Sequence, residues 1–318
     1  MGELIVLHEP HESRHGLRPE ERSITQRLRL GVFVADKPQG PSSHQVSAWV
    51  RGLVGASRAG HAGTLDPRVT GVLPIGLNNA TRALDAMLYG DKEYIGVLQL
   101  HQDIDAGKVQ AMMERFVGEV FQTPPVRSAV KRELRTRAIY ELEPLEFSGR
   151  LALFRARCES GTYIRTLCND LGEALGVGGH MLDLRRTRTA TFGERDAHSL
   201  LDLKDAVVAW HEDHDERPLM ALIQPVESLL AHLPKITVKD TAVDAICHGS
   251  NLAVPGIAKL SPGIKKGDLV AVLTAKGEGV SLATALMTAE EIVISKSGIA
   301  ADTKRVLMEP GTYPSLWK

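Results

Sequence analysis

The sharpest constraint on the fold is a change in the residue pattern near Pro234. Between about residues 30 and 200, strand-like and helix-like stretches alternate irregularly. The runs GVFVADKP and EYIGVLQL are rich in apolar and β-branched residues, as strands are. Residues 46–54 and 106–117 are expected to be helices, the latter with helical apolar spacing. This mixture predicts an α+β domain around a mixed, largely antiparallel sheet. Residues 199–234 look helical at first and then linker-like.

After this point the chain consists of short strand-like stretches separated by turn residues. The stretches 268–273 and 279–287 flank the sequence AKGE, a pattern typical of a β-hairpin. A chain of 318 residues is long enough for two separate cores. We therefore expect a polar, extended N-terminal arm (1–30), an α+β domain (31–233) and a small C-terminal β domain (234–318).

One carboxylate stands out in the first domain. Asp66 lies in the sequence HAGTLDPRVTGVL (61–73), between a glycine-containing turn and a proline, and an apolar run follows. This arrangement holds an acid on a tight, rigid loop. Asp-Pro and Thr-Gly pairs are also common in surface turns, so this segment alone does not establish a site.

Three further segments follow Asp66 in order. Tyr94 opens the strand-like stretch YIGVLQL, at a position where an aromatic residue usually fills a core. Arg165, in GTYIRTL, lies between an expected strand (LALFRARCES) and an expected helix over about 166–175. The third segment, MLDLRRT (181–187), follows a glycine-broken turn. Each has an ordinary structural explanation when taken singly, and only their combination points to a site.

Taken together, these motifs resemble the TruB-like family of pseudouridine synthases, and within it the archaeal and eukaryotic dyskerin branch. The resemblance extends to RPEERSI (18–24), DKPQGPSSH (36–44), PPVRSAVKR (124–132) and a tail (242–317) that is similar to a PUA RNA-binding domain. It implies an isomerase that converts uridine to pseudouridine in RNA, chiefly ribosomal RNA. In the dyskerin branch, an H/ACA guide RNA directs this reaction within a ribonucleoprotein.

The resemblance also implies roles for three side chains. Asp66 is expected to be the catalytic carboxylate, although the sequence leaves open whether it attacks C6 or C1′ or removes the C2′ proton. Burial alone would raise the pKa of such a carboxylate, and Arg165 matches the family's partner that offsets this with a bidentate positive charge. Tyr94 matches the tyrosine that stacks on the flipped base, worth roughly 1–3 kcal/mol, and its hydroxyl could also help to remove the C5 proton.

Four more residues match supporting positions. Leu184 corresponds to the apolar wall of the base pocket. His61 corresponds to a histidine near the flipped-out nucleotide, although a turn histidine without a role fits the sequence almost as well. Lys37 and Pro38 belong to a box that buttresses the catalytic loop, and we expect structural support from them rather than chemistry.

The charge distribution bears on the RNA hypothesis. The formal net charge is −1, so the net charge of the chain does not indicate a nucleic-acid partner. Residues 127–137, however, contain five basic side chains and one acidic one, and residues 185–188 form a second basic cluster. Taken alone, such a cluster is as often ordinary solvated surface as a binding site for the phosphates of RNA. Because the family motifs are also present, we expect these residues to bind phosphates in a salt-dependent way. The expected RNA-binding residues are Arg127, Lys131, Arg132, Arg185 and Arg186.

Several other functions are disfavoured by the sequence. The three cysteines lack a metal-ligand spacing, and an odd number argues against a disulfide framework, so we expect reduced thiols and a cytoplasmic protein. His211 and His214 stand in an acidic stretch that an exposed linker explains better than a metal site. No apolar run approaches the length of a membrane span. We expect no metal, no cofactor and no membrane partner.

The resemblance implies both RNA and protein partners. These are an H/ACA guide RNA, the target RNA, small Nop-type and Gar-type subunits, and a kink-turn-binding ribosomal-type protein that reaches the chain through the guide RNA. Two alternatives remain open. A stand-alone synthase acting on the tRNA T-loop would use the same catalytic residues, and a non-catalytic RNA scaffold would keep the fold alone. The joint presence of Asp66, Tyr94 and Arg165 argues against the scaffold.

Overall fold

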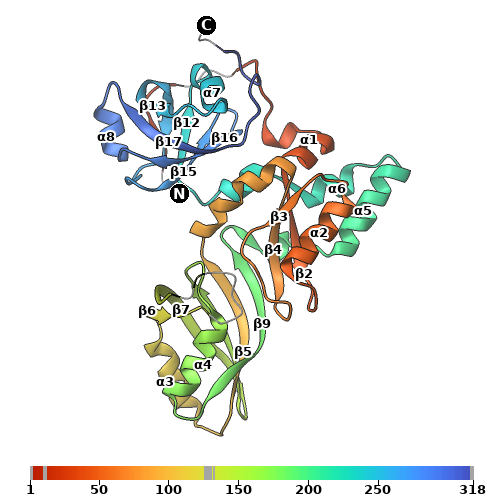
Figure 1. The fold of residues 1–318 in the computed structure, drawn as a ribbon, viewed down its shortest axis with the longest axis vertical. Helices are drawn as coiled ribbons and strands as arrows, with labels where there is room; N and C mark the ends of the chain where they lie inside the picture. The colour runs from red at the N-terminus through yellow and green to blue at the C-terminus, as the bar shows by residue number, and fades with distance from the viewer. Residues whose placement is uncertain (1–2, 10–12, 125–130, 132, 316–318) are drawn as a thin grey trace.

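The computed structural model describes residues 3–9, 13–124, 131 and 133–315. The molecule is elongated, with a β-rich C-terminal domain at one end and a long, twisted sheet running through the rest (Figure 1). The helices around the middle are α1 (Ile24–Arg29), α2 (Ser43–Leu53), α5 (Leu200–Glu212) and α6 (Arg217–Leu222). The helices at the far end are α3 (Ala106–Arg115) and α4 (Ile164–Ala174).

The larger sheet contains ten strands of the described chain, in the order β11-β2-β4-β9-β5-β8-β7-β6, with β3 beside β4 and β10 beside β9. Its neighbouring strands are antiparallel except β4 and β9, which run parallel over two residue pairs. The predicted α+β fold with a mixed, largely antiparallel sheet is confirmed. The strands are β2 (Gly31–Lys37), β3 (Ala59–His61), β4 (Thr70–Leu77), β5 (Lys92–Leu100), β6 (Gly118–Gln122), β7 (Arg135–Ser148), β8 (Leu151–Cys158), β9 (Gly179–Thr189), β10 (Phe192–Gly193) and β11 (Ile223–Pro225).

The strands form where the sequence alternates in polarity or is continuously apolar. Every second residue of β5 is buried and the residues between are half-buried, because the two faces of the strand meet different surroundings. Strands β2 and β4 are buried on both faces, as their unbroken apolar runs predict. Phe33, Leu73, Leu98 and Phe154 are fully buried in the core of this domain. Strand β9 lies between β4 and β5 and therefore joins the two halves of the sheet.

The predicted helices are present with small shifts at their ends. Helix α2 begins at Ser43 because Ser42 and Gln45 form a capping box. Helix α3 ends at Arg115, and α4 begins at Ile164, so Arg165 lies in the first turn of α4 rather than before it.

The linker-like character expected after α5 is wrong. Helix α6 follows, and β11 then pairs with β2 at the edge of the large sheet. The short 3-10 helix η4 (Val226–Leu230) buries Leu229 and Leu230. The segment is therefore part of the packed structure, and it carries the chain directly into the C-terminal domain.

The expectation that residues 1–30 form an extended arm is also wrong for most of the described part. Strand β1 (Ile5–Val6) pairs with β14 of the C-terminal sheet. Helix α1 buries Ile24 and Leu28 in the core of the first domain. Just before it, the guanidinium of Arg22 donates two hydrogen bonds, of 2.9 and 2.8 Å, to the carboxylate of Glu227. The N-terminal segment thus fastens the two domains to each other.

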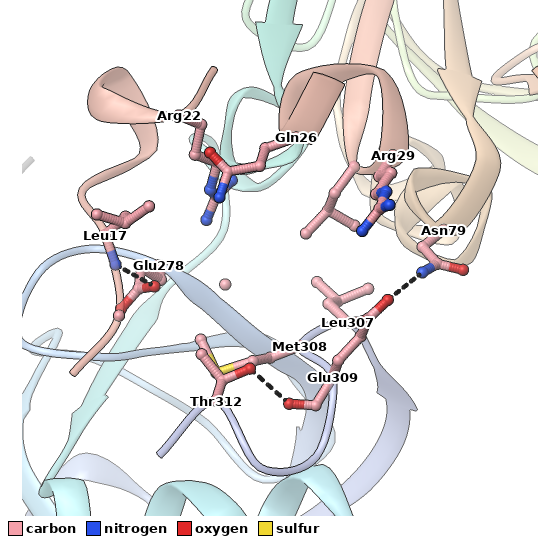
Figure 2. Close-up of a pocket in the computed structure, with 13 residues that line it drawn as sticks. Leu17, Arg22, Gln26, Arg29, Asn79, Glu278, Leu307, Met308, Glu309 and Thr312 are labelled. Atoms are coloured by element: carbon pink, nitrogen blue, oxygen red, sulfur yellow. Dashed lines mark hydrogen bonds between the residues drawn. The ribbon is translucent and has the colours of Figure 1, made fainter. Parts of the chain in front are cut away.

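A cavity of about 330 Å³ lies in this junction, between α1 and the C-terminal domain (Figure 2). On one side the backbone N–H of Leu17 donates to Glu278, at 3.0 Å. On the other side the side-chain amide of Asn79 donates to Glu309, at 3.4 Å. Contacts between segments distant in sequence therefore surround the cavity, which belongs to the interface between the domains.

The C-terminal domain is a seven-stranded β-structure in the order β1-β14-β12-β15-β16-β17-β13. The predicted hairpin is present as β15 and β16, which are antiparallel. Leu282 and Leu307 of this domain share an apolar cluster with Val226 and Leu230, so the two domains are packed against each other. The elements are β12 (Lys235–Val238), α7 (Asp240–Cys247), β13 (Leu252–Ala253), β14 (Ile257–Leu260), β15 (Leu269–Leu273), β16 (Gly279–Ala285), α8 (Ala289–Ile294) and β17 (Ile299–Val306).

Each helix in the described part of the chain is either too short or too polar to cross a membrane.

Candidate active site

Asp66 lies in the loop that connects β3 to β4, beside the first turn of α4. The backbone N–H of Val69 donates to the carbonyl of Asp66, at 3.0 Å, and closes a tight turn after the acid. The carboxylate forms an ion pair with the guanidinium of Arg165. Both side chains are about half exposed, at 49% and 47%. The structure therefore brings together two residues that are 99 positions apart in sequence and leaves the carboxylate open to a ligand.

The loop that carries Asp66 is held from behind by a buried lysine. The ammonium of Lys37, at the end of β2, donates to the carbonyls of Pro38, Pro67 and Val69 at 3.0, 3.1 and 2.8 Å. The side chain is completely buried, and this burial lowers the pKa of the Lys37 ammonium. Lys37 therefore lies where structural support of the loop was expected, and Pro38 contributes its backbone carbonyl to the same arrangement.

A second anchor was missed by the sequence reasoning. The hydroxyl of Ser43, at the start of α2, donates to the carbonyl of Leu65 at 2.9 Å and accepts from the N–H of Leu65 at 2.8 Å. Ser43 is fully buried. The sequence did contain a signal, because Ser43 belongs to the same DKPQGPSSH segment as Lys37.

Tyr94 and Leu184 lie on adjacent strands, β5 and β9. Tyr94 is 8% exposed and lies against the guanidinium of Arg186, its cross-strand neighbour; burial raises the pKa of the phenol, whereas Arg186 acts to lower it. Leu184 is 7% exposed and pairs in register with Gly96. A Cβ at Gly96 would lie 2.6 Å from the side chain of Phe154 and 2.9 Å from that of Leu184, so the glycine makes room for both. The tyrosine and the leucine therefore line one face of the sheet.

The expectation that Arg186 binds RNA is wrong. Its side chain is 1% exposed, and it donates to the carbonyls of Val72 and Gly63, each at 2.9 Å. The physical reason is the alternation of side chains along a strand: β9 turns Leu184 and Arg186 toward one face and Arg185 toward the other. Two adjacent arginines in a strand therefore cannot form one phosphate-binding cluster.

The remaining expected RNA contacts differ in their surroundings. Arg185 is on the surface but donates to Asp36 at 2.9 and 3.2 Å and to Glu194 at 2.6 Å, so two acids already balance its charge. Lys131 is 80% exposed and forms an ion pair with Glu133. Arg127 and Arg132 lie outside the described residues.

His61, at the end of β3, has an unusual environment. Both ring nitrogens are buried, and neither has a hydrogen-bond partner among the described residues. Its ring lies edge-on to that of His44, with 4.7 Å between the centroids. Burial, and then the proximity of His44 and Arg186, lower the pKa of His61 to about 4. His61 is therefore neutral near pH 7, and it lies five residues before Asp66.

Family models cover nearly the whole chain. The model described as TruB family pseudouridylate synthase (N terminal domain) matches residues 51–164, and tRNA pseudouridylate synthase B C-terminal domain matches residues 165–231. A PUA domain matches residues 234–307, and a DKCLD (NUC011) domain matches residues 3–47. A Methanopyrus kandleri protein named probable tRNA pseudouridine synthase B is 52% identical over 96% of this chain and 90% of its own length. This chain belongs to the TruB family of pseudouridine synthases.

Solved structures of family members agree with the whole fold. The crystal structure of a Cbf5-Nop10-Gar1 complex contains a chain that is 48% identical, covers 99% of this chain and 96% of its own length, and has a TM-score of 0.95. The structure of an H/ACA ribonucleoprotein bound to a substrate RNA containing 2′-deoxyuridine gives 46% identity, coverage of 99% and 97%, and a TM-score of 0.93. The recognition of this pseudouridine synthase family and of a C-terminal PUA domain is thereby confirmed.

The described part of this pseudouridine synthase contains no group of three or more histidine, cysteine or acidic side chains that could hold a metal ion. Cys158, Cys168 and Cys247 are buried free thiols, and burial raises the pKa of each to about 12. A thiol with such a pKa is protonated at neutral pH and is a poor nucleophile.

Proposed function

We propose that this pseudouridine synthase isomerises uridine in RNA, chiefly ribosomal RNA, at positions selected by an H/ACA guide RNA. One observation carries the proposal. Asp66, on a braced loop, forms an ion pair with Arg165 of α4, in a chain whose whole length resembles Cbf5 structures. We further propose that residues 31–233 form the catalytic domain and residues 234–318 the RNA-binding domain, and that the protein acts in the cytoplasm.

The proposed chemistry begins with a uridine turned out of the RNA stack, which costs a few kcal/mol. Its base would lie against the ring of Tyr94, with Leu184 forming an apolar wall of the pocket. Asp66 acts as an anion, whether it attacks C6 or C1′ or removes the C2′ proton, and Arg165 stabilises that anion when the base displaces water. The uracil then detaches from the sugar, turns and rejoins through C5, so the C5 hydrogen is released to solvent.

The proposed partners follow from the solved relatives. One of these relatives is in a complex with Nop10 and Gar1, and another is in an H/ACA ribonucleoprotein with substrate RNA. We propose that proteins of both types bind this chain together with guide and target RNA. The kink-turn-binding ribosomal-type protein is proposed from the sequence resemblance, as a partner that reaches the chain through the guide RNA.

A second candidate function is stand-alone modification of tRNA. The Methanopyrus kandleri relative, and others from Methanosarcina barkeri and Archaeoglobus fulgidus, are named probable tRNA pseudouridine synthase B. A tRNA substrate would use the same Asp66 loop. The two candidates differ in whether guide RNA and the small protein partners are needed.

The test measures tritium released from RNA that carries C5-labelled uridine. Wild-type protein and Asp66→Asn are compared on a tRNA and on a target paired to an H/ACA guide, each with and without the small partners. We expect release that requires the guide RNA and falls at least about 1000-fold in Asp66→Asn, with RNA binding nearly unchanged. Equal activity on bare tRNA would support the second candidate, and RNA binding without release in any setting would support a scaffold.

A further inference from the structure

Arg186 occupies the point where the two halves of the catalytic sheet meet. Its backbone pairs with Gly71 of β4 on one side and with Tyr94 of β5 on the other. Strand β4 follows directly on the Asp66 loop, and β5 carries the tyrosine. The residue is therefore in contact with both parts of the candidate site.

The guanidinium of Arg186 also contacts both parts of the site, the segments that flank Asp66 and the tyrosine on β5. Nε donates to the carbonyl of Val72 and Nη2 to the carbonyl of Gly63, each at 2.9 Å, and the guanidinium also lies against the phenol of Tyr94, its cross-strand neighbour. Among the described residues no carboxylate forms an ion pair with Arg186, although the side chain is 1% exposed. A buried cation is normally matched by an anion, so this one is held by its hydrogen-bond acceptors instead.

Two glycines make the close approach possible. Gly63 has φ +72°, and a Cβ there would lie 3.0 Å from Nη1 of Arg186. Gly71 has φ +105°, and a Cβ there would lie 2.2 Å from the backbone carbonyl oxygen of Arg186. The loop that carries Asp66 is therefore shaped on both sides to accommodate this one arginine.

We propose that Arg186 is a positioning residue for the isomerisation, which fixes the Tyr94 hydroxyl, and with it the tyrosine ring, relative to the loop that carries Asp66. The inference rests on the proposed function, because it assigns a task within that reaction. Arg186 itself does not touch the substrate; it acts through Tyr94. A misplacement of about 1 Å in a reacting geometry can lower a rate by about 100-fold, which sets the size of the expected effect.

The test is a double-mutant cycle on the full chain assembled with guide RNA and the small partner proteins. Single-turnover tritium release is measured for wild type, Arg186→Met, Tyr94→Phe and the double variant. The matched control is Lys92→Met. Lys92 is another buried cation on β5; it is 4% exposed and donates to the carbonyls of Met87 and Gly90, both at 2.7 Å, away from the loop.

We expect Arg186→Met to slow the reaction by about 100-fold while the Kd for substrate RNA changes less than about threefold. In the Tyr94→Phe background, the same change should have little further effect, because the hydroxyl through which Arg186 acts is already gone. Lys92→Met should stay within about threefold of wild type. If Arg186→Met does not fold, Arg186→Lys takes its place in the cycle. Lysine keeps the positive charge but lacks the planar guanidinium with its several N–H donors.

Multiplicative effects of the two substitutions, or an equal loss of rate in Lys92→Met, would overturn the inference, because Arg186 would then act on the fold in general. In that case the proposed function would stand as long as wild-type release requires Asp66. If wild type releases no tritium under any condition, the proposed function is overturned and the role of Arg186 with it.

Discussion

Replacing Lys37 by methionine tests whether the catalytic loop depends on its buried anchor. Methionine has a similar length but donates no hydrogen bond, so three bonds to carbonyls are lost. The carbonyl of Pro67 still accepts a hydrogen bond from the N–H of Gly40, at 2.8 Å. The carbonyls of Pro38 and Val69 lose the hydrogen bond from the Lys37 ammonium. Two bonds from a charged donor contribute about 3–6 kcal/mol, and relief from burying the ammonium offsets part of this, leaving a net loss of about 2–4 kcal/mol.

A loss of this size lowers Tm by about 4–16 °C for a domain of this length. We expect single-turnover tritium release by Lys37→Met to fall by about 100-fold at a temperature where the variant is fully folded, because Asp66 is no longer held against Arg165. The rate is measured on target RNA paired to guide RNA, with Tm from calorimetry on the same preparation.

The matched control for this prediction is Arg27→Met. Arg27 of α1 also donates to three carbonyls, those of Met220, Ile223 and Glu20, at 3.0, 3.1 and 3.1 Å, but it lies far from the loop in sequence and on another element. We expect a comparable decrease in Tm and a rate within about threefold of wild type. A normal rate in Lys37→Met, or an equal loss in Arg27→Met, would refute the role of Lys37 in holding the loop.

Three further predictions concern single positions. Gly63→Ala and Gly55→Ala each place a side chain at positive φ (+72° and +64°), and each should lower stability by about 1–2 kcal/mol. Only Gly63→Ala, whose new methyl group would meet the guanidinium of Arg186, should also slow tritium release by at least about 10-fold. The pKa of His61 falls from 6.5 to about 4 on folding, so the unfolded state binds more protons between these values. Urea unfolding should therefore show wild type losing stability relative to His61→Leu as pH falls from 6.5 toward 4, and equal pH profiles would contradict this. In RNA-binding titrations, Lys131→Gln should reduce the slope of log K against log salt by about 0.7, whereas Arg185→Gln should leave it almost unchanged, because two acids already balance that charge.

Much of the fold could be predicted from the sequence because its signals are local. The alternation along β5 and the continuous apolar run of β2 come from residues that are neighbours in the chain. Helix α1 could not be recognised in the same way, since its six residues contain only two buried apolar side chains, Ile24 and Leu28. Strand β11 has three residues and exists only through its pairing with β2. Such elements depend on tertiary contacts that no short window of sequence contains.

In the candidate site, too, the local features could be predicted from the sequence and those that depend on tertiary structure could not. Asp66 and Arg165 were recognised from motifs, and the structure brings their side chains together. The opposite fates of Arg185 and Arg186 could not be seen in a count of charges, because they depend on which face of β9 each side chain occupies. Residues 181–187 lie within β9, and the alternation along this strand puts the two arginines on opposite faces. The charge of a segment thus predicts a surface only after its secondary structure is known.

The buried cations explain how the loop is rigid while Asp66 remains open. The pairing of β4 with β9 spans two residue pairs, so the backbone alone joins the sheet halves weakly beside the loop. Lys37 and Arg186 supply the missing bonds to carbonyls on either flank, at Pro67 and Val69 and at Gly63 and Val72. Because neither cation needs a carboxylate for this, the acid of the loop stays available to Arg165 and to the substrate. Support from buried cation–carbonyl contacts should also resist salt, so high ionic strength should weaken RNA binding well before it disturbs the loop.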